Sequence, residues 1–133
     1  MKVIVTGSRD WPDMEAVCRA LDLALTLAQD HGAPLTVVHG GCPMGADAMA
    51  AAWVRLMRDD LEMPVIERVF EANWERYKRR AGPIRNRRMV EAGADYVIAF
   101  NRNHGRGTSG TIALADEAGI PVIRIDAEDK EAA

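Results

Sequence analysis

The chain opens with Met1-Lys2-Val3-Ile4-Val5-Thr6-Gly7-Ser8-Arg9-Asp10, a β-branched run that ends at a glycine. This pattern predicts a buried strand over residues 2–6, followed by a tight turn. The same order returns at residues 35–39, which are followed by Gly40-Gly41-Cys42-Pro43-Met44-Gly45. A strand, a glycine-rich turn and then a helix begin a crossover between parallel strands.

Helical and strand patterns alternate along the rest of the chain. We expect helices over residues 13–31, 46–60 and 108–118, and strands over residues 64–70, 95–100 and 121–125. Residues 71–94 depart from this alternation. There we expect a helical turn over residues 73–78, a break at Ala81-Gly82-Pro83, and a short helix over residues 84–92. The alternation predicts an α/β fold with a mostly parallel sheet of about five strands.

Length and composition favour one globular domain. The chain has 133 residues, of which 48% are apolar and 28% charged, close to the averages of globular domains. We expect the domain to cover residues 1–125, with a polar tail over residues 126–133. No apolar stretch approaches the roughly 18 residues of a membrane span, and no signal peptide is evident, so we expect a cytoplasmic protein without a membrane partner. Cys18 and Cys42 have no metal-site spacing and are expected to be reduced thiols.

Positive charge is concentrated in one segment. Between Glu75 and Arg88 there are seven basic residues and one acidic residue. The net charge of the chain is −3, so the rest of the molecule is strongly acidic. This distribution suits a discrete anionic ligand better than a surface that coats DNA.

Two of the glycine turns carry candidate binding residues. In an open parallel sheet, ligands bind beyond the carboxyl ends of the strands, where helix N-termini present amides to anions. After the first strand, Gly7 allows close approach of the backbone, Ser8 can donate to a phosphate oxygen, and Arg9 can grip one bidentately. After the second strand, the candidates are Gly40, Gly41 and Gly45.

Asp47 and His39 flank the second turn, and each has two interpretations. Asp47 can serve as a dipole partner of the following helix, a contact worth about 0.3–1 kcal/mol, or as a ribose-hydroxyl acceptor or general base. His39 can be a hydrogen-bonded histidine at the end of a strand or a catalytic group. Cys42 has no histidine close behind it in sequence, which disfavours a nucleophilic thiol.

Two further segments complete the candidate site. In Arg85-Asn86-Arg87-Arg88, Arg85 and Arg88 are three residues apart and share a helix face, whereas Arg87 lies on another face and is expected to be solvated or paired with Glu91. Two charge-assisted hydrogen bonds of about 1.5–3 kcal/mol each would fix a phosphate there. In His104-Gly105-Arg106-Gly107-Thr108, the glycines allow a phosphate-binding nest, and Thr108 can cap a helix.

The three tryptophans differ in context. Trp53 lies on the expected buried face of its helix and is predicted to be core. Trp11 and Trp74 adjoin the candidate loops, where each can stack on a base or cover the sheet edge.

These motifs together resemble the SLOG superfamily, and within it the branch related to YspA and YpsA. The resemblance rests on Gly7-Ser8-Arg9-Asp10-Trp11, on residues 39–47, on residues 81–89 and on residues 105–108, and it extends from residue 1 to about residue 125. It implies a Rossmann-like three-layer sandwich that binds nucleotides or nucleotide-derived ligands at the strand ends. Related proteins include the LOG phosphoribohydrolases and DNA-processing protein A, which binds single-stranded DNA.

One position departs from the enzymes of this superfamily. LOG proteins carry a glutamate in a Pro-Gly-Gly-x-Gly-Thr-x-x-Glu motif, and the corresponding position here is Thr111. Arg85 and Met89 match the arginine and methionine of the enzymes' helix, so the resemblance implies phosphate binding by Arg85. Cleavage of a glycosidic bond normally needs a carboxylate to stabilise a cationic sugar. Asp47 is the only acidic residue of a matched motif that we consider as a substitute catalytic residue.

Three hypotheses follow. In the first, the chain is a sensor or binding domain for a phosphorylated nucleotide-type ligand. In the second, it is a hydrolase that cleaves an N-glycosidic bond. In the third, the basic segment binds single-stranded nucleic acid, which the acidic remainder of the chain disfavours. We expect no resident metal, although a phosphate ligand can bring a divalent ion with it, and the resemblance makes a homo-oligomer plausible.

Overall fold

The computed structural model describes residues 1–102 and 106–127, and it contains one five-stranded parallel sheet. The strands lie in the order β3-β2-β1-β4-β5. Their bounds are β1 Lys2–Gly7, β2 Leu35–His39, β3 Val65–Val69, β4 Tyr96–Asn101 and β5 Val122–Asp126. The expectations for His104 and Gly105, and for most of the polar tail, lie outside the described residues.

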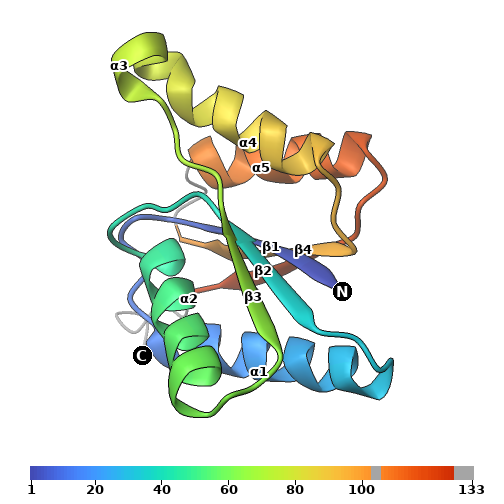
Figure 1. Cartoon of the computed structure of the whole chain (residues 1–133). Coiled ribbons are helices and arrows are strands. Elements are labelled where there is room, and N and C mark those ends of the chain that lie inside the picture. Colours follow the sequence, from blue (N-terminus) through green and yellow to red (C-terminus); the bar gives the residue numbers. More distant parts are fainter. Residues whose placement is uncertain (103–105, 128–133) are drawn as a thin grey trace.

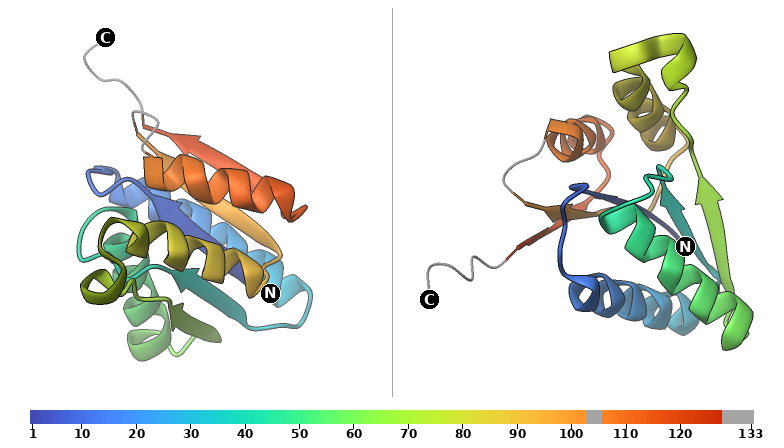
Figure 2. Two further views of the ribbon diagram at one scale, coloured as in Figure 1. Left: turned by 90° about the horizontal axis from the view of Figure 1, so that it is seen from above. Right: turned by 90° about the vertical axis from the view of Figure 1, so that its left-hand side faces the viewer.

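Helices cover both faces of the sheet (Figure 1). The helices α1 (Met14–Asp30) and α2 (Ala46–Arg55) pack on one face, and α4 (Ala81–Glu91) and α5 (Arg106–Glu117) pack on the other. The right-hand view of Figure 2 shows the sheet between these two helical layers. The predicted three-layer α/β sandwich with a parallel sheet is therefore confirmed.

The apolar core lies on both sides of β1. Val3 and Val5 pack with residues of α1 and α2, whereas Ile4 packs with Met89 of α4 and Ala115 of α5. This alternation is what the period of two in a strand requires when both faces are buried. Trp53 is buried in the α1–α2 layer, as predicted, and its indole N–H donates to Asp22 at 2.9 Å.

Most helix ends agree with the sequence signals. Asp13 caps α1 and accepts a hydrogen bond from the Ala16 amide at 3.1 Å. The helix expected over residues 46–60 comprises α2 and a short π-helix, η1 (Leu56–Asp60). The helical turn expected at residues 73–78 is α3 (Trp74–Tyr77), which Asn73 caps.

The break predicted at Ala81-Gly82-Pro83 is wrong. Helix α4 begins at Ala81 and directly follows a 3₁₀ turn, η2 (Lys78–Arg80). Pro83 lies in the first turn of α4, where a backbone N–H needs no acceptor within the helix. The proline is therefore compatible with the helix start and does not interrupt it.

The strand order places a crevice at one end of the sheet. From β1 the chain crosses through α1 to β2 on one side, whereas β4 lies on the other side of β1. The loops after β1 and β4 therefore separate at a topological switch point, where open α/β sheets bind ligands. Within the described residues, no helix is long and apolar enough to cross a membrane.

Candidate functional site

A cleft of about 1530 Å³ opens at the carboxyl edge of the sheet. The loops that follow β1 and β2 line it, together with α3, the first turns of α4 and the start of α5. Ten of the twelve residues predicted for the site lie on its walls: Gly7, Ser8, Arg9, Gly40, Gly41, Asp47, Arg85, Asn86, Gly107 and Thr108. Gly45 and Arg88 are not among the lining residues.

Ser8 ties the loop after β1 to the end of β4. Its hydroxyl donates to the Arg102 carbonyl and accepts from the Arg102 amide, both at 3.1 Å, and its own amide donates to the Phe100 carbonyl at 3.2 Å. Arg102 also donates to the Asp10 carbonyl at 3.0 Å. The Ser8 hydroxyl therefore uses its proton in a hydrogen bond that holds the loop in place. Arg102 also lines the cleft, and the sequence did not predict it as a site residue.

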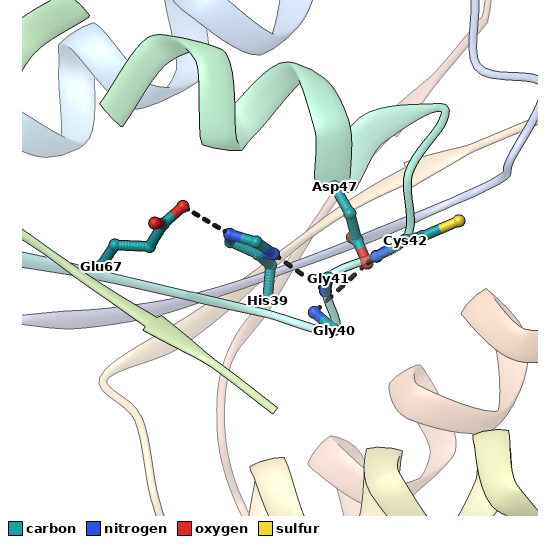
Figure 3. Close-up of polar contacts among 6 residues, drawn as sticks. All are labelled: His39, Gly40, Gly41, Cys42, Asp47 and Glu67. Atoms are coloured by element: carbon teal, nitrogen blue, oxygen red, sulfur yellow. Dashed lines mark hydrogen bonds and ion pairs between the residues drawn. The ribbon is translucent and has the colours of Figure 1, made fainter. Parts of the chain in front are cut away.

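The loop after β2 is held by His39 (Figure 3). The Gly41 amide donates to Nδ1 of His39 at 3.0 Å, and Nε2 lies 2.8 Å from a carboxylate oxygen of Glu67. A backbone N–H can only donate, so Nδ1 is the acceptor of this hydrogen bond. His39 is 2% exposed and does not line the cleft. Both ring nitrogens of His39 therefore have partners within the protein. This agrees with the interpretation of His39 as a hydrogen-bonded histidine at the end of a strand.

Asp47 anchors the same loop from the first turn of α2. Its Oδ2 accepts from the Gly40 amide at 3.2 Å and from the Cys42 amide at 3.3 Å (Figure 3). Burial raises the pKa of the Asp47 carboxyl above its ordinary value, while the nearby His39, the two amides and the charge of Arg85 oppose that rise. The carboxylate is thus a structural acceptor for the loop and also a wall of the cleft.

Gly45 joins the two loops from outside the cleft. It has a φ of 75°, and a Cβ added there would lie 2.3 Å from the Ser8 carbonyl oxygen and 2.7 Å from the Arg9 Cα. Such distances are shorter than van der Waals contact, and only glycine adopts this φ readily. Gly45 therefore fixes the loop after β1 against the start of α2.

Arg85 reaches from α4 to the loop after β2. Its Nη1 donates to the Gly40 carbonyl at 2.7 Å, and its Nε donates to the side chain of Asn86 at 2.7 Å. Burial lowers the pKa of the guanidinium, and the carboxylate of Asp47 opposes that change. Among the described residues, none accepts a hydrogen bond from Nη2.

Arg87 and Arg88 are placed differently from the expectation. Arg88 is exposed and lies off the cleft, whereas Arg87 is exposed and lines it. The cleft extends along the side of α4 that faces α5, where Leu114 and Glu117 also line it. No ion pair between Arg87 and Glu91 occurs in the described part of the chain.

The start of α5 contributes Gly107 and Thr108 to the cleft wall. Because α5 begins at Arg106, Thr108 lies in its first turn and does not cap the helix as predicted. Thr111, at the position of the LOG glutamate, is fully buried, and its hydroxyl donates to the Gly107 carbonyl at 3.1 Å. A hydroxyl bonded to the preceding turn of its own helix has no proton to offer a ligand. Position 111 therefore supplies neither an acid nor a free donor to the cleft.

The two tryptophans near the loops have different environments. Trp11 is 2% exposed, and its ring packs against Phe100 with centroids 5.4 Å apart. Trp74 on α3 is 48% exposed and lines the cleft. The guanidinium of Arg9 lies 5.8 Å from the centroid of the Trp74 ring. Of the two stacking candidates, only Trp74 is accessible.

The cleft is more positive than the chain as a whole. Six arginines and four acidic residues line it, although the whole chain has a net charge of −3. The arginines are Arg9, Arg79, Arg80, Arg85, Arg87 and Arg102. Across residues 1–102 and 106–127, no group of three or more His, Cys, Asp or Glu residues is placed to hold a metal ion.

Comparison with known proteins identifies related sequences. The YspA, cpYpsA-related SLOG family matches residues 1–77, which run from β1 to the end of α3. Gene 61 protein of Mycobacterium phage D29 is 41% identical over 124 residues, a match that covers 92% of this chain and 94% of the phage protein. No solved structure matches the chain.

Proposed function

The chain belongs to the YspA, cpYpsA-related SLOG family, and from this membership and the geometry of the cleft we propose that it binds a nucleotide or a nucleotide-derived phosphorylated ligand. The ligand binds at the carboxyl edge of the sheet, and the domain acts as a binding or sensing module.

The arrangement of Arg85 carries this proposal. Two of its nitrogens are fixed by protein acceptors, one of them the Gly40 carbonyl at 2.7 Å, while Nη2 has no acceptor among the described residues. A guanidinium held in this way loses little rotamer entropy when it binds an anion. It stands beside the glycine turn after β2, in a cleft lined by five further arginines. A phosphate group satisfies this combination of charge and donors.

Among the residues of the matched motifs, Asp47 and Thr111 favour binding without turnover. The oxygen Oδ2 of Asp47 accepts from two loop amides, and Thr111 is buried. Glycosidic cleavage needs a carboxylate near the sugar. If the protein does cleave an N-glycosidic bond, released base should appear on incubation with a nucleoside monophosphate, and Asp47→Asn should abolish that release.

The proposal predicts that Arg85→Ala weakens nucleotide binding. We expect the affinity for ADP, measured by calorimetry, to fall at least tenfold, because one charge-assisted hydrogen bond contributes about 1.5–3 kcal/mol. Arg88→Ala is the matched control, since Arg88 lies on the same helix but off the cleft, and it should leave the affinity unchanged. Equal losses in the two variants, or no binding by the unmodified chain, would contradict the proposal.

Single-stranded nucleic acid is the competing ligand. Binding of an oligonucleotide that weakens steeply with added salt, and that is tighter than the binding of ADP, would favour this alternative.

A further inference from the structure

We propose that the indole of Trp74 is the base-stacking surface of the cleft, so that the ligand class is nucleotides with an intact aromatic base rather than sugar phosphates or inorganic phosphate. This inference rests on the proposed function and adds to it the part of the ligand that determines selectivity.

The exposure of Trp74 is the first observation. The chain has three tryptophans. Trp11 and Trp53 are 2% and 1% exposed, and both belong to the apolar core. Trp74 is 48% exposed and lies on the wall of the cleft. A large aromatic ring that lines a charged cleft offers a flat apolar surface, which every nucleobase can use through its own π-face.

The contact with Arg9 is the second observation. The Arg9 guanidinium lies 5.8 Å from the centroid of the Trp74 ring, a cation–π distance. Arg9 comes from the loop after β1 and Trp74 from α3, so the pair joins two walls of the cleft. Both side chains are exposed, and an exposed cation–π contact is weaker than the stacking of a base on an aromatic ring. A base can therefore replace the guanidinium or lie between it and the indole.

The spacing between Trp74 and Arg85 is the third observation. A Cβ added at Gly82 would lie 3.4 Å from Cη2 of Trp74, so the edge of the indole reaches the first turn of α4. Gly82 and Arg85 are three residues apart on this helix, which corresponds to roughly 4.5 Å along its axis. In Figure 1, α3 lies at the start of α4. A base on Trp74 and a phosphate at Arg85 are therefore close enough for a single ribose to connect them.

The experiment uses ADP, which contains adenine and two phosphates, and ribose 5-phosphate, which has the sugar and one phosphate but no base. Because the two ligands also differ in the number of phosphates, the test is how each variant changes each affinity. We expect ADP, but not ribose 5-phosphate, to change the fluorescence of the exposed tryptophan and to protect it from quenching by iodide. Trp74→Leu should reduce the affinity for ADP by tenfold or more and leave the affinity for ribose 5-phosphate unchanged. Trp74→Phe should retain part of the affinity for ADP, because it keeps an aromatic face.

Tyr77→Leu is the control variant, because Tyr77 is an aromatic residue of the same helix that does not line the cleft. It should leave both affinities unchanged. If ADP and ribose 5-phosphate bind equally well and Trp74→Leu changes neither affinity, the stacking inference is overturned while the proposed function stands. If neither ligand binds to the unmodified chain, both are overturned.

Discussion

The loop after β2 and the arm that carries α3 and η2 both line the cleft, but different kinds of contact hold them. In the loop, His39 accepts a hydrogen bond from the Gly41 amide, and Asp47 accepts hydrogen bonds from the amides of Gly40 and Cys42. Arg85 donates a hydrogen bond to the Gly40 carbonyl. In the arm, residues 74–80 are exposed or half-buried. The hydrogen bonds described there are local, such as the one from the Arg76 amide to the Asn73 side chain at 3.1 Å, and Trp74 also has its cation–π contact with Arg9.

This difference assigns different tasks to the two regions. A loop whose polar groups are already bonded holds Arg85 in place before an anion arrives, so binding costs little reorganisation. An arm with few tertiary contacts opens at lower free energy than the core. We infer that the loop supplies the fixed phosphate site and that the arm supplies the adaptable wall for the base.

Gly45→Ala should cause the largest loss of stability, because it disrupts the fixed region. The new methyl group would lie 2.3 Å from the Ser8 carbonyl oxygen, in a residue with a φ of 75°. Overpacking costs about 1–3 kcal/mol and a left-handed residue other than glycine about 1–2 kcal/mol. We expect the free energy of unfolding in urea to fall by about 3 kcal/mol.

Gly119→Ala separates the two causes of this loss. Gly119 has a φ of 73°, but a Cβ there would have no neighbour within 4 Å. Only the backbone cost applies, so we expect a loss of about 1 kcal/mol. If the two alanine variants were equally stable, the packing of Gly45 against Ser8 would not hold the loops together.

Asp47→Ala should cause the next largest loss. It removes the acceptor of the Gly40 and Cys42 amides in a buried position, and an unsatisfied buried donor costs about 1–3 kcal/mol. Asp47→Asn keeps a carbonyl oxygen that can accept the same two hydrogen bonds, so we expect it to unfold within about 1 kcal/mol of the unmodified chain. An Asn variant as unstable as the Ala variant would mean that the charge, and not the acceptor, is essential.

The pH dependence of stability provides a second test of Asp47. Burial raises the pKa of this carboxyl in the folded chain above the 3.8 of an ordinary aspartate. Between the ordinary and the raised value, the folded chain binds more protons than the unfolded chain, so its free energy of unfolding falls as the pH increases. Asp47→Asn removes this contribution. The free energy of unfolding of the unmodified chain, relative to that of Asp47→Asn, should therefore fall as the pH increases from 3.8. If the free energies of the two chains changed in parallel with pH, the raised pKa of Asp47 would be contradicted.

The sequence predicts the features that depend on local signals, but not the contacts that depend on how the strands pair. The strand at residues 35–39 has the predicted bounds, and Asp13 caps α1 as predicted, because periodicity, caps and turns are local signals. The bond between His39 and Glu67 depends on the pairing of β2 with β3. Glu67 pairs with Val37, two residues before His39. Its side chain therefore lies on the same face of the sheet as that of His39. No local pattern in the sequence shows this register.

Local signals mislead the prediction at the start of α4, directly after the arm. Gly82 and Pro83 are typical of a break, but the first turn of a helix accommodates a proline because its backbone nitrogens need no acceptor within the helix. Arg102 was missed because its contacts with Ser8 and Asp10 join loops more than 90 residues apart in sequence. The strand ends that form the site could be predicted, but the side chains that meet there depend on tertiary packing.

Lys78→Gly tests the arm and should have the smallest effect. Lys78 is the first residue of η2, directly after α3, and has a φ of 53° and a ψ of −126°. Glycine adopts this conformation more readily than other residues. Glycine relieves this strain but also increases the entropy of the unfolded chain, so the two effects partly cancel. We expect Lys78→Gly to be more stable in urea than Lys78→Ala by about 0.5–1 kcal/mol. If the alanine variant were the more stable of the two, the backbone at Lys78 would not be strained.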